Sequence, residues 1–204
     1  MPRPTKSEAA RSPKRDQLVA AAARLFYRDG YHAVGIDTIL ADAQIAKMTL
    51  YRNFATKEDL IVATIQKRAE TISGEVSVAV SQAGPSMRSR LLALFGWYEN
   101  WFRSPGFAGC AMLRAAGEYP ELGSAVHQSV VRAKAAGRAN LELILSELDP
   151  RRAKELASQI DLLLQGAISC AHTYGDPSQI DHARKAALNL LERAHSPHSP
   201  GRGR

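Results

Sequence analysis

The sequence predicts an all-α fold. Five prolines, Pro85, Pro105, Pro120, Pro150 and Pro177, divide the chain after residue 84, and proline is disfavoured inside helices but tolerated in their first turn. Between these prolines the apolar residues recur at intervals of three and four, which is the period of an amphipathic helix. The sequence shows no sustained alternation of apolar and polar residues, the pattern that indicates a strand.

Glycine rather than proline separates the predicted helices before Pro85. The first covers residues 15–29 and stops at Gly30, because glycine readily ends a helix in the left-handed conformation. The second follows Gly35, an acceptable N-cap, and carries Asp37 in its first turn, where a carboxylate suits the helix dipole. The apolar faces consist of Leu18, Ala22, Leu25 and Phe26 in the first helix and of Ile36, Ile39, Leu40 and Ala43 in the second.

A third short helix is predicted over residues 46–53, with Leu50 and Phe54 pointing inward, after a turn at Gln44 and Ile45. Two helices of about two turns joined by a turn of about three residues form a helix-turn-helix. Thr56 then serves as N-cap of a long helix, with Asp59 three residues on in a capping-box-like position.

Four further helices follow the proline boundaries. We expect them over residues 86–104, from residue 121 onward, over residues 151–174 and over residues 178–194. Leu122, Val126 and Val130 are expected on the apolar face of the second of these four.

Composition excludes several classes of protein. The 204 residues carry a net charge of +7, and a chain of this length can bury roughly 70% of its unfolded surface without disulfides or a metal. No apolar run approaches the roughly 18 residues of a membrane-spanning helix, and Met1 is not followed by the apolar core of a signal peptide. We therefore expect a cytoplasmic protein with no membrane association and no metal site. Its two cysteines, Cys110 and Cys170, are interpreted as small buried hydrophobic residues.

More than half of the basic excess lies in the first 15 residues, where five cations and the single carboxylate of Glu8 give a net charge of +4. A basic, proline-containing arm before a folded domain is typical of nucleic-acid binding, and a solvated arm without a specific role fits the same composition. Residues 195–204 form a second segment that we interpret as a disordered tail.

The segment from Leu18 to Leu60 carries a distinctive pattern of residues. It contains Leu25-Phe26, Gly30-Tyr31, Ile36-Asp37-Thr38-Ile39, Ala43-Gln44-Ile45-Ala46-Lys47-Met48-Thr49-Leu50-Tyr51-Arg52-Asn53-Phe54 and Thr56-Lys57-Glu58-Asp59-Leu60. These residues resemble the DNA-binding domain of the TetR/AcrR family of transcriptional regulators. Gly109-Cys110-Ala111-Met112 and Glu118-Tyr119-Pro120 also look like one subgroup of that family.

The resemblance implies a domain organisation and a function. Residues 1–13 would be a disordered basic arm, 14–60 a three-helix DNA-binding domain with the helix-turn-helix, and 61–194 a helical ligand-binding and dimerisation domain. The expected protein is a homodimeric, ligand-responsive repressor that a small molecule releases from a double-stranded, palindromic DNA operator. It would not be an enzyme and would need no cofactor.

The resemblance also assigns roles to residues of the helix-turn-helix. Lys47, Met48 and Thr49 are the candidates for contact with base edges. The candidates for contact with the phosphate backbone are Thr38, Tyr51, Arg52, Asn53 and Lys57. The alternative for Tyr51 is a place in the core, and for Arg52 and Lys57 it is a solvated surface position.

Two positions depart from the family pattern. Gly35 stands where Ser or Thr is common, so a capping hydroxyl is missing. Gln44 stands where glycine is common, and a non-glycine residue there costs roughly 1 kcal/mol if its φ is positive.

The regulatory half has two predicted features. In the family the last two helices form the dimer interface, for which residues 157, 160, 164, 167, 168 and 171 of one helix and 183, 187 and 190 of the other supply small and branched side chains. An ordinary intramolecular bundle requires the same pattern.

An effector pocket is expected around a cluster of aromatic residues, and Met87 could line it as well. For each of these residues the alternative is an ordinary place in the core. The candidates are Trp97, Tyr98, Trp101, Phe102, Cys110, Met112, His127, His172 and Tyr174.

Two other functions compete with the ligand-responsive regulator. A thiol-based redox sensor would use Cys110 or Cys170 as its switch. A DNA-packaging protein would bind DNA without sequence preference. An enzyme is disfavoured because the sequence contains no evident nucleophile and base pair, phosphate loop or glycine-rich cofactor turn.

Overall fold

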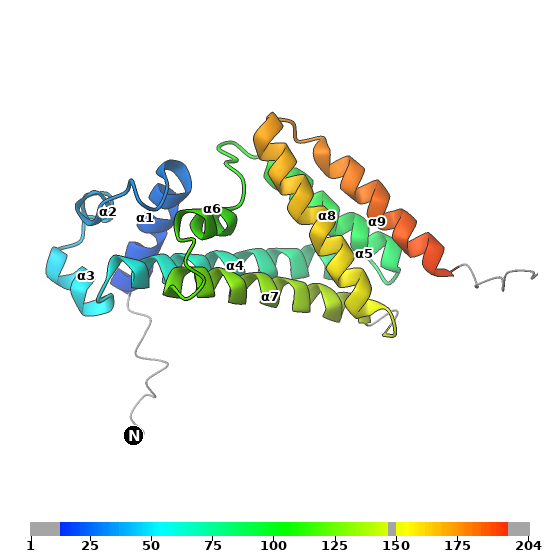
Figure 1. Cartoon of the computed structure of the whole chain (residues 1–204), viewed down its shortest axis with the longest axis horizontal. Coiled ribbons are helices and arrows are strands. Elements are labelled where there is room, and N and C mark those ends of the chain that lie inside the picture. The colour runs from blue at the N-terminus through cyan, green and yellow to red at the C-terminus, as the bar shows by residue number, and fades with distance from the viewer. Residues whose placement is uncertain (1–12, 147–149, 196–204) are drawn as a thin grey trace, which may run out of the picture. The chain divides into compact units, whose positions relative to one another are not determined.

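The computed structural model describes residues 13–146 and 150–195, and within these ranges it contains nine α-helices and no strand. The prediction of an all-α fold is confirmed. The predicted basic arm, apart from Pro13, and the predicted tail, apart from His195, lie outside the described residues. The helices are α1 (Pro13–Asp29), α2 (Ile36–Ala43), α3 (Lys47–Asn53), α4 (Lys57–Ser81), α5 (Met87–Phe102), α6 (Ala111–Glu118), α7 (Ala125–Ser146), α8 (Ala153–Tyr174) and α9 (Gln179–His195), as Figure 1 shows.

The helices group into two compact units. Unit 1 comprises residues 1–72 and 110–135, and unit 2 comprises residues 73–109 and 136–204. Packing therefore places α6 and the first half of α7 with the N-terminal helices, whereas the sequence suggested a boundary at residue 60. That functional boundary stays a prediction.

The core of unit 1 is formed by the apolar faces that the helical periodicity indicated. Leu18, Phe26, Ile39, Leu50 and Leu60 are each at most 1% exposed. Helix α1 ends as predicted, because Gly30 takes a positive φ of 97° and donates its N–H to the carbonyl of Phe26 at 3.0 Å. The chain can therefore turn sharply between α1 and α2.

Unit 2 is built on the paired helices α8 and α9, with α5 against α9. Alanines at the contact, among them Ala157 and Ala187, are fully buried and let the helix axes approach closely. Arg184 of α9 donates to Glu99 of α5 at 3.0 Å and also pairs with Asp181. Helix α5 starts at a serine cap, because the Ser86 hydroxyl accepts the Ser89 N–H at 3.1 Å.

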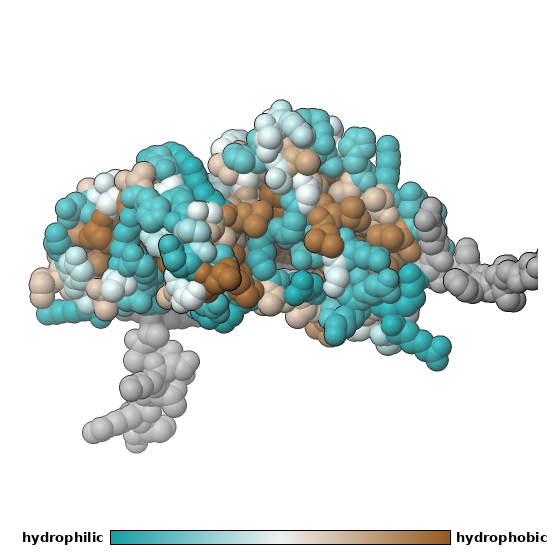
Figure 2. Space-filling view, in the orientation of Figure 1, coloured by the Kyte–Doolittle hydropathy of each residue, from teal (hydrophilic) through white to brown (hydrophobic). Residues whose placement is uncertain are grey.

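The residues proposed from sequence for a dimer interface are almost all buried within a single chain. Residues 157, 160, 164, 167, 168, 171, 183 and 187 are at most 6% exposed, so intramolecular packing accounts for them. Figure 2 shows apolar patches on the surface of unit 2. Leu162 of α8 is 72% exposed. The dimer interface itself stays a prediction.

Two further details differ from the prediction. Helix α7 begins at Ala125 rather than at residue 121, because the Ser124 hydroxyl caps it by accepting the His127 N–H at 3.1 Å. Leu122 thus lies in the preceding turn and is 71% exposed instead of buried. Helix α6 was not predicted as a separate element. No described helix is long and apolar enough to cross a membrane.

Candidate nucleic-acid interface

Helices α2 and α3 are joined by a tight turn that depends on one unusual backbone conformation. Gln44 has φ 53° and ψ 42°, the left-handed region, and is the one non-glycine residue with positive φ in the described ranges. The N–H groups of Gln44 and Ile45 reach back to the carbonyls of Ala41 and Leu40 at 3.3 and 3.2 Å. The helix-turn-helix therefore forms as predicted, with strain at the position where the family commonly has glycine.

Helix α1 fixes the end of α2 through side chains. Gln17 donates to the carbonyl of Ala43 at 2.8 Å, and Arg24 pairs with Asp42 at 2.6 Å. At the other end Gly35 provides no side-chain cap, in agreement with the departure noted in the sequence. The orientation of α2 is thus set mainly by α1 and by buried Ile39.

Helix α3 has a buried face and an exposed face. Leu50 is fully buried and Phe54, which ends the helix, is 4% exposed. Met48 is 68% exposed and Tyr51 is 48% exposed, and Lys47 and Arg52 are exposed as well. Tyr51 is therefore a surface residue and not the core aromatic that the sequence left as an alternative.

Lys47 makes a contact that the sequence did not indicate. Its ammonium lies 3.3 Å from the Asp37 carboxylate of α2, with both side chains more than half exposed. An exposed pair of this kind is worth about 0.2–1 kcal/mol, so a phosphate or a base can compete with it. Thr38, next to Asp37, is also exposed.

Two candidate residues make hydrogen bonds within α3. Asn53 donates from its side-chain amide to the carbonyl of Thr49 at 2.7 Å, and both residues are half-buried. One donor of Asn53 is thus occupied at the helix end, and its second amide hydrogen is the group left for a phosphate oxygen.

Lys57 stands at the first position of α4 and is half-buried. Its ammonium lies 3.4 Å from the carbonyl of His32 and 6.0 Å from the ring of Phe26, and burial lowers the pKa of Lys57. The predicted capping box is present, since Thr56 and Asp59 exchange bonds of 2.9 and 3.1 Å. A phosphate contact by Lys57 therefore requires the ammonium to leave the His32 carbonyl, and the carboxylate of Asp59 already occupies the helix N-terminus.

Helix α6 is hydrogen-bonded to the end of α1 and to the turn between α1 and α2, which the sequence did not predict. Glu118 accepts the backbone N–H of His32 at 2.7 Å, and the His32 ring bonds the Glu118 carbonyl at 2.6 Å. Arg114 donates to the carbonyl of Tyr27 at 2.9 Å, and the Tyr31 hydroxyl donates to Ala111 at 3.0 Å. We call the two His32–Glu118 bonds the α6 clasp. The sequence feature in this region is the Gly109–Pro120 segment, which resembles a family subgroup but did not indicate a contact with His32.

The nine residues suggested for an effector pocket fall into two groups. Cys110, Met112 and His127 belong to unit 1, where Met112 is core and the His127 ring bonds the Tyr119 carbonyl at 2.9 Å. The other six belong to unit 2, in which Tyr174 is 70% exposed. Phe102 and His172 line one cleft of about 260 Å³. We call it the aromatic cleft, and its lining includes Phe102, Ser104, Phe107, His172, Gly175 and Pro177.

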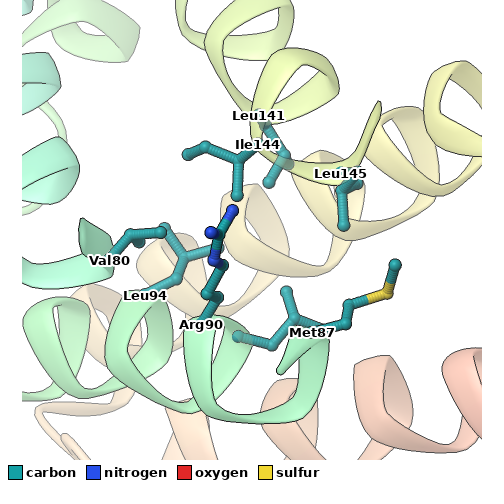
Figure 3. A pocket seen from close by; sticks show the side chains of 8 residues that line it. Val80, Met87, Arg90, Leu94, Leu141, Ile144 and Leu145 are labelled. Carbon is teal, nitrogen blue, oxygen red and sulfur yellow. The ribbon is translucent and has the colours of Figure 1, made fainter. Parts of the chain in front are cut away.

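A second space in unit 2 lies among α4, α5 and α7. Figure 3 shows the Arg90 side chain extending among apolar side chains, and Met87 contributes to the same lining. This space is too narrow to hold a water molecule. Nor do three or more His, Cys, Asp or Glu side chains gather into a metal site among the described residues.

Comparison with known proteins identifies both parts of the chain. A family model described as bacterial regulatory proteins of the tetR family matches residues 18–64, and a model described as a tetracyclin repressor-like C-terminal domain matches residues 88–187. Together they match most of the chain.

Relatives agree with these matches. The chain is 31% identical over 93 residues to the HTH-type transcriptional activator FasR of Mycolicibacterium smegmatis, covering 44% of this chain and 42% of that protein. It is 33% identical over 83 residues to an HTH-type transcriptional regulator of Mycobacterium tuberculosis, covering 41% of this chain and 38% of that protein. The matches thus span about two fifths of the length of these curated relatives.

Solved structures extend the likeness over the whole fold. SCO4454, a TetR-family transcriptional regulator from Streptomyces coelicolor, is 28% identical with a TM-score of 0.81, covering 92% of this chain and 98% of that chain. The reduced form of Escherichia coli NemR, at 19% identity and a TM-score of 0.79 over 87% of this chain and 96% of that chain, shares the fold. The chain belongs to the TetR family of bacterial transcriptional regulators, and it is a DNA-binding regulator rather than an enzyme.

Proposed function

We propose that the protein is a homodimeric repressor that binds a palindromic operator through α3 and dissociates when a small molecule binds in the C-terminal half. The observation that carries the DNA-binding part is the two-faced character of α3. Leu50 fixes the helix to the core of unit 1, while Lys47, Met48 and Tyr51 project from it. A short helix held this way suits insertion into a major groove.

The candidate residues in and around the helix-turn-helix suit two kinds of contact. Lys47, Met48 and Thr49 at the start of α3 offer a cation, a flexible apolar chain and a hydroxyl for base edges. Tyr51, Arg52, Asn53, Lys57 and Thr38 offer donors for phosphate oxygens. Of these five, Lys57 must break the most contacts to reach a phosphate, because its side chain is half-buried and its ammonium donates to the His32 carbonyl.

The dimer is proposed from the operator geometry that the family implies. A palindromic site needs two recognition helices about one duplex turn apart, which one chain cannot supply. Because the alanine-rich faces of α8 and α9 are buried internally, we assign the contact to the outward face of α8. Leu162, Gly166, Ser169 and Thr173 are exposed there at helical spacing.

Substitution of single side chains tests the DNA-binding assignment. A duplex first selected from a random pool by the wild-type protein supplies the operator, and fluorescence anisotropy supplies the affinity. Lys47→Ala and Tyr51→Ala are expected to weaken binding at least about tenfold, as the loss of a good base or phosphate contact does. Lys67→Ala removes an exposed lysine of α4 outside the helix-turn-helix and serves as the control. Wild-type affinity in the first two variants contradicts the assignment.

Salt dependence separates base contacts from phosphate contacts. Removal of one phosphate contact reduces the slope of log K against log salt by about 0.9. We expect this change for Arg52→Ala and Lys57→Ala, with operator preference retained. Lys47→Ala should instead reduce the preference for the operator over competitor DNA. Equal binding of operator and competitor by the wild-type protein would indicate a packaging protein.

The sign of regulation is tested with a reporter gene behind the operator. Repression predicts higher expression when the regulator gene is deleted. FasR is described as an activator, so lower expression on deletion would assign that sign to this protein as well.

One observation favours a second candidate, a thiol-based sensor. The Cys110 sulfur accepts a hydrogen bond from the Lys134 ammonium at 3.4 Å within unit 1, so modification of the thiol would break a contact between α7 and the residue before α6. Alkylation with N-ethylmaleimide should then weaken operator binding by the wild-type protein and leave Cys110→Ser unaffected. Unchanged affinity after alkylation of both cysteines excludes the sensor.

A further inference from the structure

We infer that the aromatic cleft of unit 2 binds a small organic cation with an aromatic body, and that this ligand is the effector. The inference rests on the proposed function for the effector role and on the cleft itself for the ligand class. At about 260 Å³ the cleft is smaller than the roughly 300–1,000 Å³ of sites for drug-sized ligands, so a one-ring molecule fits best.

The walls of the cleft are aromatic rings held in place from several sides. Phe107 lies 5.0 Å from Phe102 and 5.2 Å from Trp101, measured between ring centroids. The His172 ring meets the Phe107 ring edge-on at 6.4 Å. A flat ligand can thus contact ring faces and edges without displacing the core.

Phe107 owes its position to a short turn. The Ser104 hydroxyl donates to the Trp101 carbonyl at 2.6 Å, and the Phe107 N–H donates to the Ser104 carbonyl at 3.2 Å. Gly109 closes the turn with a φ of 77°, and a Cβ there would lie 2.9 Å from Cγ of His172. The loop from residue 103 to 109 therefore packs on α8 through the imidazole ring.

The electrostatic surroundings favour a positive charge. The lining contains no lysine or arginine, and Arg103, beside Ser104, is bound by Glu99 at 3.1 Å. Helix α8 ends at Tyr174 and is capped by Gly175, which lines the cleft, and the C-terminus of a helix carries partial negative charge. Aromatic faces attract cations as well.

Asp176 adds a formal negative charge between two lining residues, Gly175 and Pro177. Its carboxylate accepts the Ser178 N–H at 2.9 Å and bonds the Ser178 hydroxyl and the Gln179 amide, each at 2.8 Å. These bonds lower the pKa of Asp176, so the group stays ionised at neutral pH. Asp176 is not itself a lining residue, so its charge acts from the neighbouring turn, and the lining offers no lysine or arginine to an anionic ligand.

The cleft also has a direct connection to the helix that touches the DNA-binding region. Ser104 and Phe107 lie on the loop that runs straight into Cys110 and α6. At the other end of α6, the α6 clasp holds His32 between α1 and α2. A ligand that moves Phe107 therefore shifts the loop that leads into α6, and α6 ends at the α6 clasp.

Three probes of one size test the charge preference. Benzylammonium, benzyl alcohol and benzoate share a ring and differ in charge, and titration calorimetry on the full chain without DNA gives each affinity. Benzylammonium is expected to bind about tenfold more tightly than benzyl alcohol, with benzoate weakest. Benzylammonium binding no tighter than benzyl alcohol overturns the inference, and so does tighter binding of benzoate.

Variants locate the site. Phe107→Leu keeps apolar volume but removes a ring and should weaken benzylammonium about tenfold, whereas Leu92→Ala, an exposed change on α5 outside the cleft, should not. His172→Lys retains the Cβ and Cγ atoms against Gly109 and places a cation in the cleft, so it should reverse the order of benzylammonium and benzoate. Circular dichroism confirms folding, and an unchanged order in a folded His172→Lys protein refutes the location.

Operator release is measured separately. Wild-type operator binding, established first, tests the proposed function independently of any probe. Benzylammonium should then weaken that binding in wild-type protein and not in Phe107→Leu at the same concentration. Cation binding without operator release would overturn the effector role and leave the ligand class standing.

Discussion

Removing the Asp37 carboxylate should strengthen operator binding, because Lys47 would no longer have to break its ion pair with Asp37 before it contacts DNA. The two groups lie 3.3 Å apart with side chains that are 59% and 85% exposed for Lys47 and Asp37. Exposed pairs contribute about 0.2–1 kcal/mol, which corresponds to a gain of about 1.4- to 5-fold in affinity for Asp37→Asn. The gain should shrink with added salt, since salt screens both the pair and the approach of the phosphates.

A double-mutant cycle isolates this pair. Operator affinity is measured by anisotropy at low salt for Asp37→Asn, Lys47→Ala and the double variant. All measurements are made well below the melting temperature of each variant, because Asp37 also stabilises the first turn of α2. The gain should vanish in the Lys47→Ala background. Asp16→Asn removes the same charge from an exposed position in the first turn of α1 and controls for the general loss of repulsion. The reasoning is refuted if Asp37→Asn gives the same gain with and without Lys47.

Three further predictions concern stability. Gln44→Gly should raise the free energy of unfolding by about 0.5–1 kcal/mol, because relief of left-handed strain exceeds the entropy cost of glycine; urea unfolding that shows no gain contradicts the strain. Leu50→Ala, at a fully buried site, should cost about 2–5 kcal/mol in the same assay, against less than about 0.5 for Met48→Ala; similar losses contradict the two-faced description of α3. The bond from Arg184 lowers the pKa of Glu99, so the stability that Glu99 contributes is present above its unfolded pKa of about 4.3 and is lost as the pH falls below that value. In urea unfolding from pH 6 to pH 3, the midpoint should therefore fall less in Glu99→Gln than in the wild-type protein.

The parts of the fold that sequence predicted are those set by local chemistry. Gly30 ends α1, Thr56 and Asp59 cap α4, and the left-handed turn stands at Gln44, each determined by neighbours within a few residues. The buried side of α3 followed from the spacing of Leu50 and Phe54. Such signals do not depend on how distant elements pack.

The parts that sequence did not predict depend on the crossing of elements. The Lys47–Asp37 pair joins α2 to α3, and the α6 clasp joins residues 86 positions apart. The small residues of α8 and α9 gave a pattern that suits a bundle within one chain and an interface between two chains equally well. Their burial shows that packing within one chain uses this pattern, which periodicity alone could not indicate, and the interface between two chains stays a prediction.

The division into units indicates where a regulatory signal can pass. Three segments join unit 1 to unit 2, namely α4, the loop before α6, and α7. Helices α4 and α7 are continuous across the division, and a continuous helix resists bending because each turn is fixed by its own hydrogen bonds. The loop crosses at Gly109, whose φ is 77°, and Phe107 of the same loop lines the aromatic cleft. Of the three, the loop is therefore the segment without a helical ladder of hydrogen bonds, and it leads into α6, whose Glu118 bonds His32, a residue that Lys57 of α4 also contacts.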